Sequence, residues 1–172
     1  MTDVPETPTD DPTDHYPDLD HERYVERTLE LAREAAKRGD NPYGSLLVDP
    51  EAEDGPTVVA EARNTVVTDE DLRGHPELTL AARARSDLPA AVRERTIMYT
   101  STEPCPMCAG GIAHSGLAAV VHSVSQEHAA QFAGRDDVLP SRVVYDRTGA
   151  DTVSLGPVTP EAGIAVHHDH SE

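Results

Sequence analysis

The chain has 172 residues, a size that suits one compact domain. Its 32 acidic residues against 14 basic ones give a formal net charge of −18, which argues against a nucleic-acid partner, because phosphate binding needs patches of lysine and arginine. No stretch approaches the roughly 18–20 apolar residues of a membrane span, and two cysteines do not make a secreted disulfide framework, so a cytoplasmic protein without a membrane partner is expected.

The first forty residues divide into a polar segment and a helix. Residues 1–19 are rich in Pro, Thr and Asp and poor in apolar side chains, which predicts a disordered acidic tail. Apolar residues then repeat at i, i+3 and i+4 spacing, which predicts a helix over 20–38. Asp20 is a suitable N-cap for this helix, and Gly39 is a suitable residue just beyond its end.

The rest of the chain alternates strands and helices. The turn-rich sequence DPEAEDGP joins strands expected at 44–49 and 57–64, which predicts an antiparallel hairpin. Further elements are expected as a helix at 75–85, a strand at 96–101, a helix at 105–116, a strand at 117–123, a short helix at 125–132, strands at 142–145 and 152–155, and a last helix at 159–168. Because β-α-β crossovers are right-handed, the strands at 57–64, 96–101 and 117–123 should run parallel beneath covering helices. The pattern predicts a single α/β domain over residues 20–172.

Two short segments carry the candidate chemistry, HPE at 75–77 and PCPMC at 104–108. Cys105 and Cys108 lie three residues apart at a helix start, so both sulfurs can face one centre. The helix N-terminus favours the thiolate form that a metal ion needs. His75 begins another helix after a strand, and loops at the carboxyl ends of strands converge on one crevice. One histidine and two cysteines can therefore meet.

Three protein ligands with one open position are typical of a catalytic zinc site rather than a structural one. Such a zinc lowers the pKa of its water towards ~7, which provides a nucleophile at neutral pH. Glu77 lies two residues from His75, so it can stand beside the metal without binding it, as a proton shuttle should. A redox pair or a structural zinc site is the alternative for the two cysteines.

The two segments together resemble the H-x-E and P-C-x-x-C signature of zinc deaminases that act on nucleobases. The chain is similar to the cytidine-deaminase-like superfamily, most closely its guanine, cytosine and tRNA adenosine deaminase branch, over about 42–123. The block TSTEPCPMCAGGIAHSG at 100–116 carries most of this resemblance, and NPYG at 41–44 matches the start of the branch's first strand. Pro76 departs from the alanine usual in the family, and a proline is acceptable at a first helical position.

The resemblance implies a three-layer α/β/α sandwich with a central mixed sheet, and a homodimer. It implies that Zn²⁺ is held by His75, Cys105 and Cys108, that Glu77 is the general acid and base, and that Asn64 contacts the base. We therefore expect hydrolytic deamination of a small nucleobase or nucleoside, of guanine or cytosine type, with release of ammonia. A tRNA adenosine deaminase and a non-catalytic zinc-stabilised binding module are the alternatives.

Several further residues permit two interpretations. Glu103 can contact substrate or lie in a turn. Asp136 and Asp137 follow a glycine, where a surface turn is the safer interpretation. The histidines at 167, 168 and 170 are expected to form a solvated tail.

The acidic charge carries a second implication. Lys37 is the only lysine, and acidic residues occur in almost every segment rather than in one tail. Such a surface repels itself at low salt and suits a medium in which salt screens it. A halophilic protein adapted to a saline cytoplasm is therefore expected, with an ordinary acidic protein as the alternative.

Overall fold

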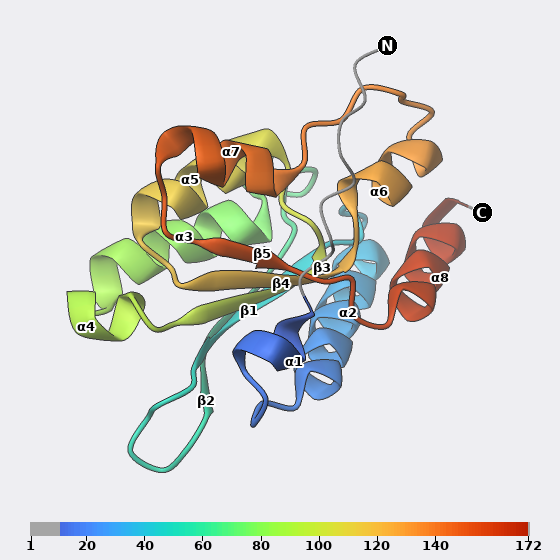
Figure 1. Ribbon diagram of the computed structural model, residues 1–172. Coiled ribbons are helices and arrows are strands. Elements are labelled where there is room, and N and C mark those ends of the chain that lie inside the picture. The colour runs from blue at the N-terminus through green and yellow to red at the C-terminus, as the bar shows by residue number, and fades with distance from the viewer. Residues whose placement is uncertain (1–10, 172) are drawn as a thin grey trace.

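The computed structural model describes residues 11–171, and its central feature is a five-stranded sheet with the order β2-β1-β3-β4-β5 (Figure 1). The strands are β1 (Gly44–Asp49), β2 (Thr57–Arg63), β3 (Ile97–Thr102), β4 (Ala119–Val124) and β5 (Val153–Leu155). β1 is antiparallel to both of its neighbours, whereas β3, β4 and β5 pair in parallel. The last four strands therefore run in one direction, and their carboxyl ends lie at one edge of the sheet.

Helices cover both faces of this sheet (Figure 1). One layer contains α2 (His21–Lys37) and α8 (Pro160–Ser171), and the opposite layer contains α3 (Pro76–Asp87), α5 (Pro106–Ser115) and α7 (Ser141–Thr148). The shorter helices are α1 (Pro12–His15), α4 (Ala90–Arg93) and α6 (Gln126–Phe132). The expected three-layer α/β/α sandwich with a central mixed sheet is confirmed. The parallel direction expected for β2, β3 and β4 is also confirmed, although β1 lies between β2 and β3 in the sheet.

The core lies on both faces of the three central strands. Ile97 and Tyr99 pack with apolar side chains of α2, whereas Met98 between them packs with those of α3 and α5. This alternation follows from the two-residue period of a strand, and each central strand is buried along its whole length.

A side-chain cap and a close approach to β1 position α2 on this sheet. Asp20 accepts a hydrogen bond from the Arg23 N–H at 3.1 Å, which caps the first turn. Gly44 begins β1 against this helix, and a Cβ there would overlap the main chain of Thr28 and the side chain of Leu31. The predicted helix at 20–38 and the hairpin of β1 and β2 are both confirmed.

Two expectations for the elements are wrong. The strand expected at 142–145 is the helix α7, which buries Tyr145 and ends at Gly149 with a positive φ of 68°. Of the tail expected over 1–19, residues 1–10 lie outside the described part of the chain. Residues 11–19 are ordered, because Tyr16 and Leu19 pack against the core beside α1.

The region after β4 otherwise follows expectation. The short helix α6, the strand β5 and the final helix α8 lie where they were predicted, and α8 extends three residues further, to Ser171. Across residues 11–171, none of the helices combines the length and the apolar character needed to traverse a lipid bilayer.

Candidate metal centre and active site

Two helix N-termini meet at the carboxyl edge of the sheet. His75 is the N-cap residue of α3 and Cys105 is the N-cap residue of α5, and each is followed by a proline in the first turn. Neither N-cap side chain makes a capping hydrogen bond. Because they are not used for capping, these two side chains remain available for a shared ligand.

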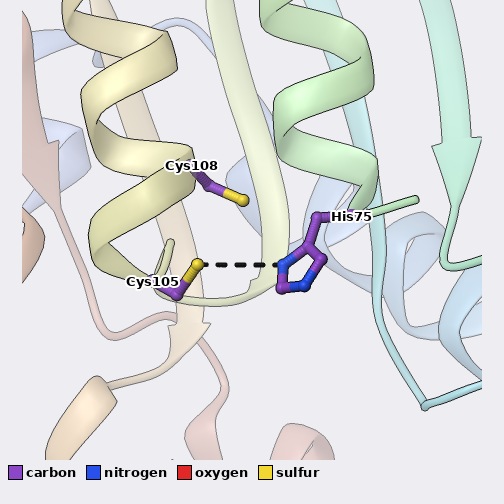
Figure 2. Close-up of side chains that lie close together, drawn as sticks. All are labelled: His75, Cys105 and Cys108. Carbon is purple, nitrogen blue, oxygen red and sulfur yellow. Dashed lines mark hydrogen bonds between the residues drawn. The ribbon is translucent and has the colours of Figure 1, made fainter. Parts of the chain in front are cut away.

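The donor atoms of His75, Cys105 and Cys108 all lie within 4.8 Å of one another. Figure 2 shows both sulfurs projecting from α5 towards the imidazole ring at the start of α3, with Cys105 Sγ 3.7 Å from His75 Nδ1. Donors of a tetrahedral zinc site, at ~2.0–2.3 Å from the metal, are separated by about 3.6 Å. The nitrogen and sulfur atoms therefore fit a zinc ion in type and in spacing.

The three groups influence one another electrostatically. Contact with the Cys108 thiol, with a further contribution from His75, lowers the pKa of Cys105 to about 4. The same contact raises the pKa of Cys108, and Cys105 raises the pKa of His75. A thiolate on Cys105 that is stabilised by its two neighbours matches the form in which cysteine binds zinc.

Glu77 stands beside these groups and is buried. The hydroxyl of Thr100, on β3, donates a hydrogen bond of 3.0 Å to Oε1 of Glu77. Burial raises the pKa of the Glu77 carboxyl to about 7. The helical position after Pro76 therefore directs the carboxylate inward, as the HPE segment predicted.

Asn64 is brought near the site by the closure of loop 65–74. The Thr65 N–H donates to the Gly74 carbonyl oxygen at 2.9 Å, which makes Asn64 and His75 neighbours across the loop. Asn64 is buried, and its Oδ1 accepts the Val66 N–H at 3.0 Å. Its Nδ2 has no partner among the described residues. A buried amide with an unused donor is a candidate contact for a ligand.

A cavity of about 200 Å³ opens over the donor groups. It is lined by Tyr43, His75, Glu77, Thr102, Glu103, Cys105, Gln126, Ala129, Ala130, Ala133 and Arg135. Asn64 is not among these lining residues. Part of the lining comes from the segment 126–135, which begins with α6, and His75 and Glu77 line the same cavity.

One of the three C-terminal histidines differs from expectation, whereas His168 and His170 are exposed as expected. His167 lies on α8, is buried rather than solvated, and its Nε2 is 3.1 Å from Thr102 Oγ1. Its ring packs edge-on against Tyr43 and stacks on Phe132. A tail of small and polar residues gave no signal of this docking. Asp136 and Asp137 are exposed, as predicted, and lie in the loop that follows α6 rather than in a turn.

Sequence reasoning also missed residues that hold the site together. Thr100 supports Glu77, and its place in a buried strand two residues from Met98 was the available signal, because it faces the same side. Asp40 accepts hydrogen bonds from the Val67 and Thr68 N–H groups and thereby anchors loop 65–74. No local sequence pattern indicated this contact between Asp40 and the loop.

Comparison with known proteins places this geometry in context. A family model described as MafB19-like deaminase matches residues 19–143. A guanine deaminase of Bacillus subtilis is 37% identical over 120 residues, which cover 69% of this chain and 73% of that protein.

Two further relatives cover more of the chain. A protein named as a probable cytosine deaminase in Schizosaccharomyces pombe is 28% identical over 152 residues, which cover 84% of this chain and 88% of that protein. A solved structure of a guanine deaminase from Nitrosomonas europaea superposes with a TM-score of 0.70 at 18% identity, covering 87% of this chain and 83% of that one. At this identity the last similarity concerns the fold.

Proposed function

The chain belongs to the MafB19-like deaminase family, and we propose that it is a zinc-dependent hydrolase that deaminates a free nucleobase or nucleoside. One observation carries the proposal. The His75, Cys105 and Cys108 donors converge within 4.8 Å of one another, and the buried carboxylate of Glu77 lies beside them under a cavity. The relatives named above favour guanine or cytosine as the base.

In this proposal His75, Cys105 and Cys108 hold the zinc ion. When bound, zinc would lower the pKa of a water molecule towards ~7 and so supply the attacking oxygen. Glu77 takes a proton from the attacking water and delivers it to a ring nitrogen of the base. It then takes the remaining proton from the new hydroxyl group and passes it to the exocyclic amine; the C–N bond breaks, ammonia leaves, and the ring carbon keeps the oxygen as a carbonyl group.

The hydrogen bond from Thr100 gives Glu77 a defined orientation for this work. Because Oε1 of Glu77 accepts the Thr100 hydroxyl, the second carboxylate oxygen is left for the reacting atoms. Burial keeps bulk water from competing for these protons. Asn64 would donate its unused Nδ2–H groups to an acceptor on the base and so orient it.

The size and charge of the cavity favour a small substrate. Its volume of about 200 Å³ is below the ~300–1,000 Å³ that is usual for sites of drug-sized ligands. Arg135 is the one lysine or arginine among the described residues that line it, and the whole chain carries a charge of −18. A tRNA substrate would require more phosphate contacts than this surface offers.

The test is ammonia release from purified protein loaded with zinc in molar KCl, using guanine, cytosine, adenine, their nucleosides and a tRNA transcript. Release from a free base or nucleoside is expected, and chelation of the metal should abolish it. Glu77→Gln should reduce turnover by ~10²–10⁴-fold or more while zinc content stays the same. Release from tRNA alone would support the adenosine deaminase alternative. Release from no substrate with zinc bound would favour a binding module.

The homodimer implied by family resemblance stays a prediction. Analytical ultracentrifugation at high salt would test it independently of activity.

A further inference from the structure

A buried carboxylate in the metal loop, which is the segment 103–105 between β3 and α5, is not used by the proposed chemistry. Glu103 directly follows β3, two residues before Cys105, and is almost fully buried. Its own N–H continues the sheet by donating to the Val124 carbonyl oxygen at 2.7 Å. Its side chain contacts two helices that come later in the chain.

Each oxygen of this carboxylate holds the start of a different helix. Oε2 accepts the Gln126 N–H at 2.9 Å, at the first residue of α6. Oε1 accepts both the N–H and the hydroxyl of Ser141 at 2.7 Å, at the first residue of α7. No lysine or arginine pairs with Glu103 among residues 11–171. Main-chain and hydroxyl donors therefore stabilise its charge.

α7 depends on this contact, because its own N-cap residue, Pro140, offers no side-chain hydrogen bond. An unmet N–H at a helix start is costly when buried, and the Glu103 carboxylate satisfies it from another part of the chain. The Ser141 hydroxyl also lies 3.0 Å from Ser154 Oγ on β5, which extends the connection into the sheet.

α6 forms part of the wall of the cavity that the metal donors His75 and Cys105 also line. Gln126, Ala129 and Ala130 line the cavity from this helix, and His75 and Glu77 line the same cavity. Figure 1 shows α6 standing beyond the edge of the sheet, and the ring of Phe132 at its end stacks on His167 of α8. The stacking on α8 holds the end of α6, whereas the bond between Glu103 and Gln126 holds its start beside the metal loop.

We propose that Glu103 is a positioning residue that fixes the α6 wall of the substrate pocket to the metal loop through the N-termini of α6 and α7. This inference rests on the proposed deaminase function for its kinetic consequence. Glu103 lines the cavity, but its two carboxylate oxygens accept three hydrogen bonds from α6 and α7, so its role in this proposal is to hold these helices. The pocket width, and hence base binding, should be sensitive to it, whereas the chemical step should not.

The variant Glu103→Gln tests this with minimal change of shape. Its NH₂ group must face either the Gln126 N–H or the Ser141 N–H, and in both cases two donors confront each other. KM for the deaminated base should rise by about tenfold or more, while kcat stays within about threefold. Zinc should remain at one ion per chain, because the donors at 75, 105 and 108 are untouched.

Two further variants keep the test specific. Glu127→Gln makes the same charge change one residue further along α6, where the side chain is exposed, and should leave KM and kcat unchanged. Ser141→Ala removes one of the two bonds to Oε1 and should raise KM in the same direction by a smaller factor. If Glu103→Gln does not fold, the KM of Ser141→Ala decides the question.

Amide hydrogen exchange provides a readout that needs no activity. Exchange at residues 126–132 should accelerate in Glu103→Gln and not in Glu127→Gln, with zinc content unchanged. If the wild-type protein deaminates nothing, the proposed function fails while this measurement still tests the anchor. An unchanged KM with unchanged exchange in α6, or a fall in kcat alone, would overturn the positioning role.

Discussion

The Thr100 hydroxyl lies 3.0 Å from Oε1 of Glu77 and joins the central strand β3 to the first turn of α3. Replacing it with Thr100→Val keeps the shape but leaves the buried carboxylate without this donor. We expect kcat to fall by about tenfold or more at full zinc occupancy, because a hydrogen bond to a charged group is lost. Steady-state kinetics at measured zinc content would show the effect.

Two variants identify the cause of this loss. Thr100→Ser restores the hydroxyl and should restore most of kcat. Ser45→Ala removes the Ser45 hydroxyl, which donates a hydrogen bond of 2.8 Å to Thr100 Oγ1. The contact between Thr100 and Glu77 stays in place, so kcat should stay within about threefold. A Thr100→Val protein with normal kcat would contradict a supporting role for this hydroxyl.

His75→Ala should release zinc, because only two of the three donors remain at the site. Loss of a single outer-shell partner already weakens metal binding by ~10–100-fold, so loss of a direct ligand should exceed that. Atomic absorption after dialysis measures the change. The matched control is His114→Ala on the exposed surface of α5, which should retain one zinc per chain. Equal zinc content in both variants would rule out His75 as a ligand.

Asp40→Asn should loosen the loop that connects Asn64 to His75. The Asp40 carboxylate accepts the Val67 N–H at 3.0 Å and the N–H and hydroxyl of Thr68 at 2.9 Å. An amide cannot accept all three bonds, so we expect a loss of ~1–3 kcal/mol in the free energy of unfolding and a higher KM. Urea denaturation measures the first quantity. Asp69→Asn, an exposed change in the same loop, should alter neither.

The sequence alone was sufficient for the elements that carry local patterns. The amphipathic helix α2 repeats with the helical period, and β3 and β4 are short buried segments rich in apolar residues; all three lie within two residues of where they were predicted. The convergence of His75 with Cys105 and Cys108 was also predictable. It follows from helix spacing within one motif and from the shared direction of β2 and β3.

Elements that depend on distant contacts were not predictable. Val143 and Val144 favour a strand by propensity, but a carboxylate 38 positions earlier caps the segment, and burial of Tyr145 selects a helix. The packing of His167 against Tyr43 likewise depends on a contact between residues far apart in the sequence. Such contacts leave no periodic signal, because their partners are set by the assembled fold.

Acid should weaken the link between Asp49 and Arg95. Two hydrogen bonds of 2.8 and 2.9 Å join these side chains and hold the pKa of the Asp49 carboxyl below its usual value. A lowered folded-state pKa contributes stability that is complete above the unfolded value of ~4 and disappears as pH falls through the folded value. Asp49→Asn should therefore be less stable than wild type at pH 6, and this difference should shrink below about pH 4.

Urea midpoints measured between pH 3 and pH 7 would reveal this dependence. Glu53→Gln removes one charge from the same hairpin at an exposed position and should track wild type at every pH. A constant difference between wild type and Asp49→Asn over the whole range would show that Asp49 contributes through packing and not through its charge.

Salt should stabilise the fold, because 32 acidic residues face only 14 basic ones. The Debye length falls from ~10 Å at 0.1 M to ~3 Å at 1 M salt, so repulsion between distant carboxylates is removed. Screening also weakens the ion pairs of Arg27 with Glu30 and Glu61, but these pairs are solvent-exposed and contribute little. Relief of ~3 kcal/mol of repulsion would raise Tm by about 6–12 °C. Calorimetry in KCl from 0.1 to 2 M would measure it, with sucrose as an uncharged control, and a Tm independent of KCl would contradict adaptation to a saline medium.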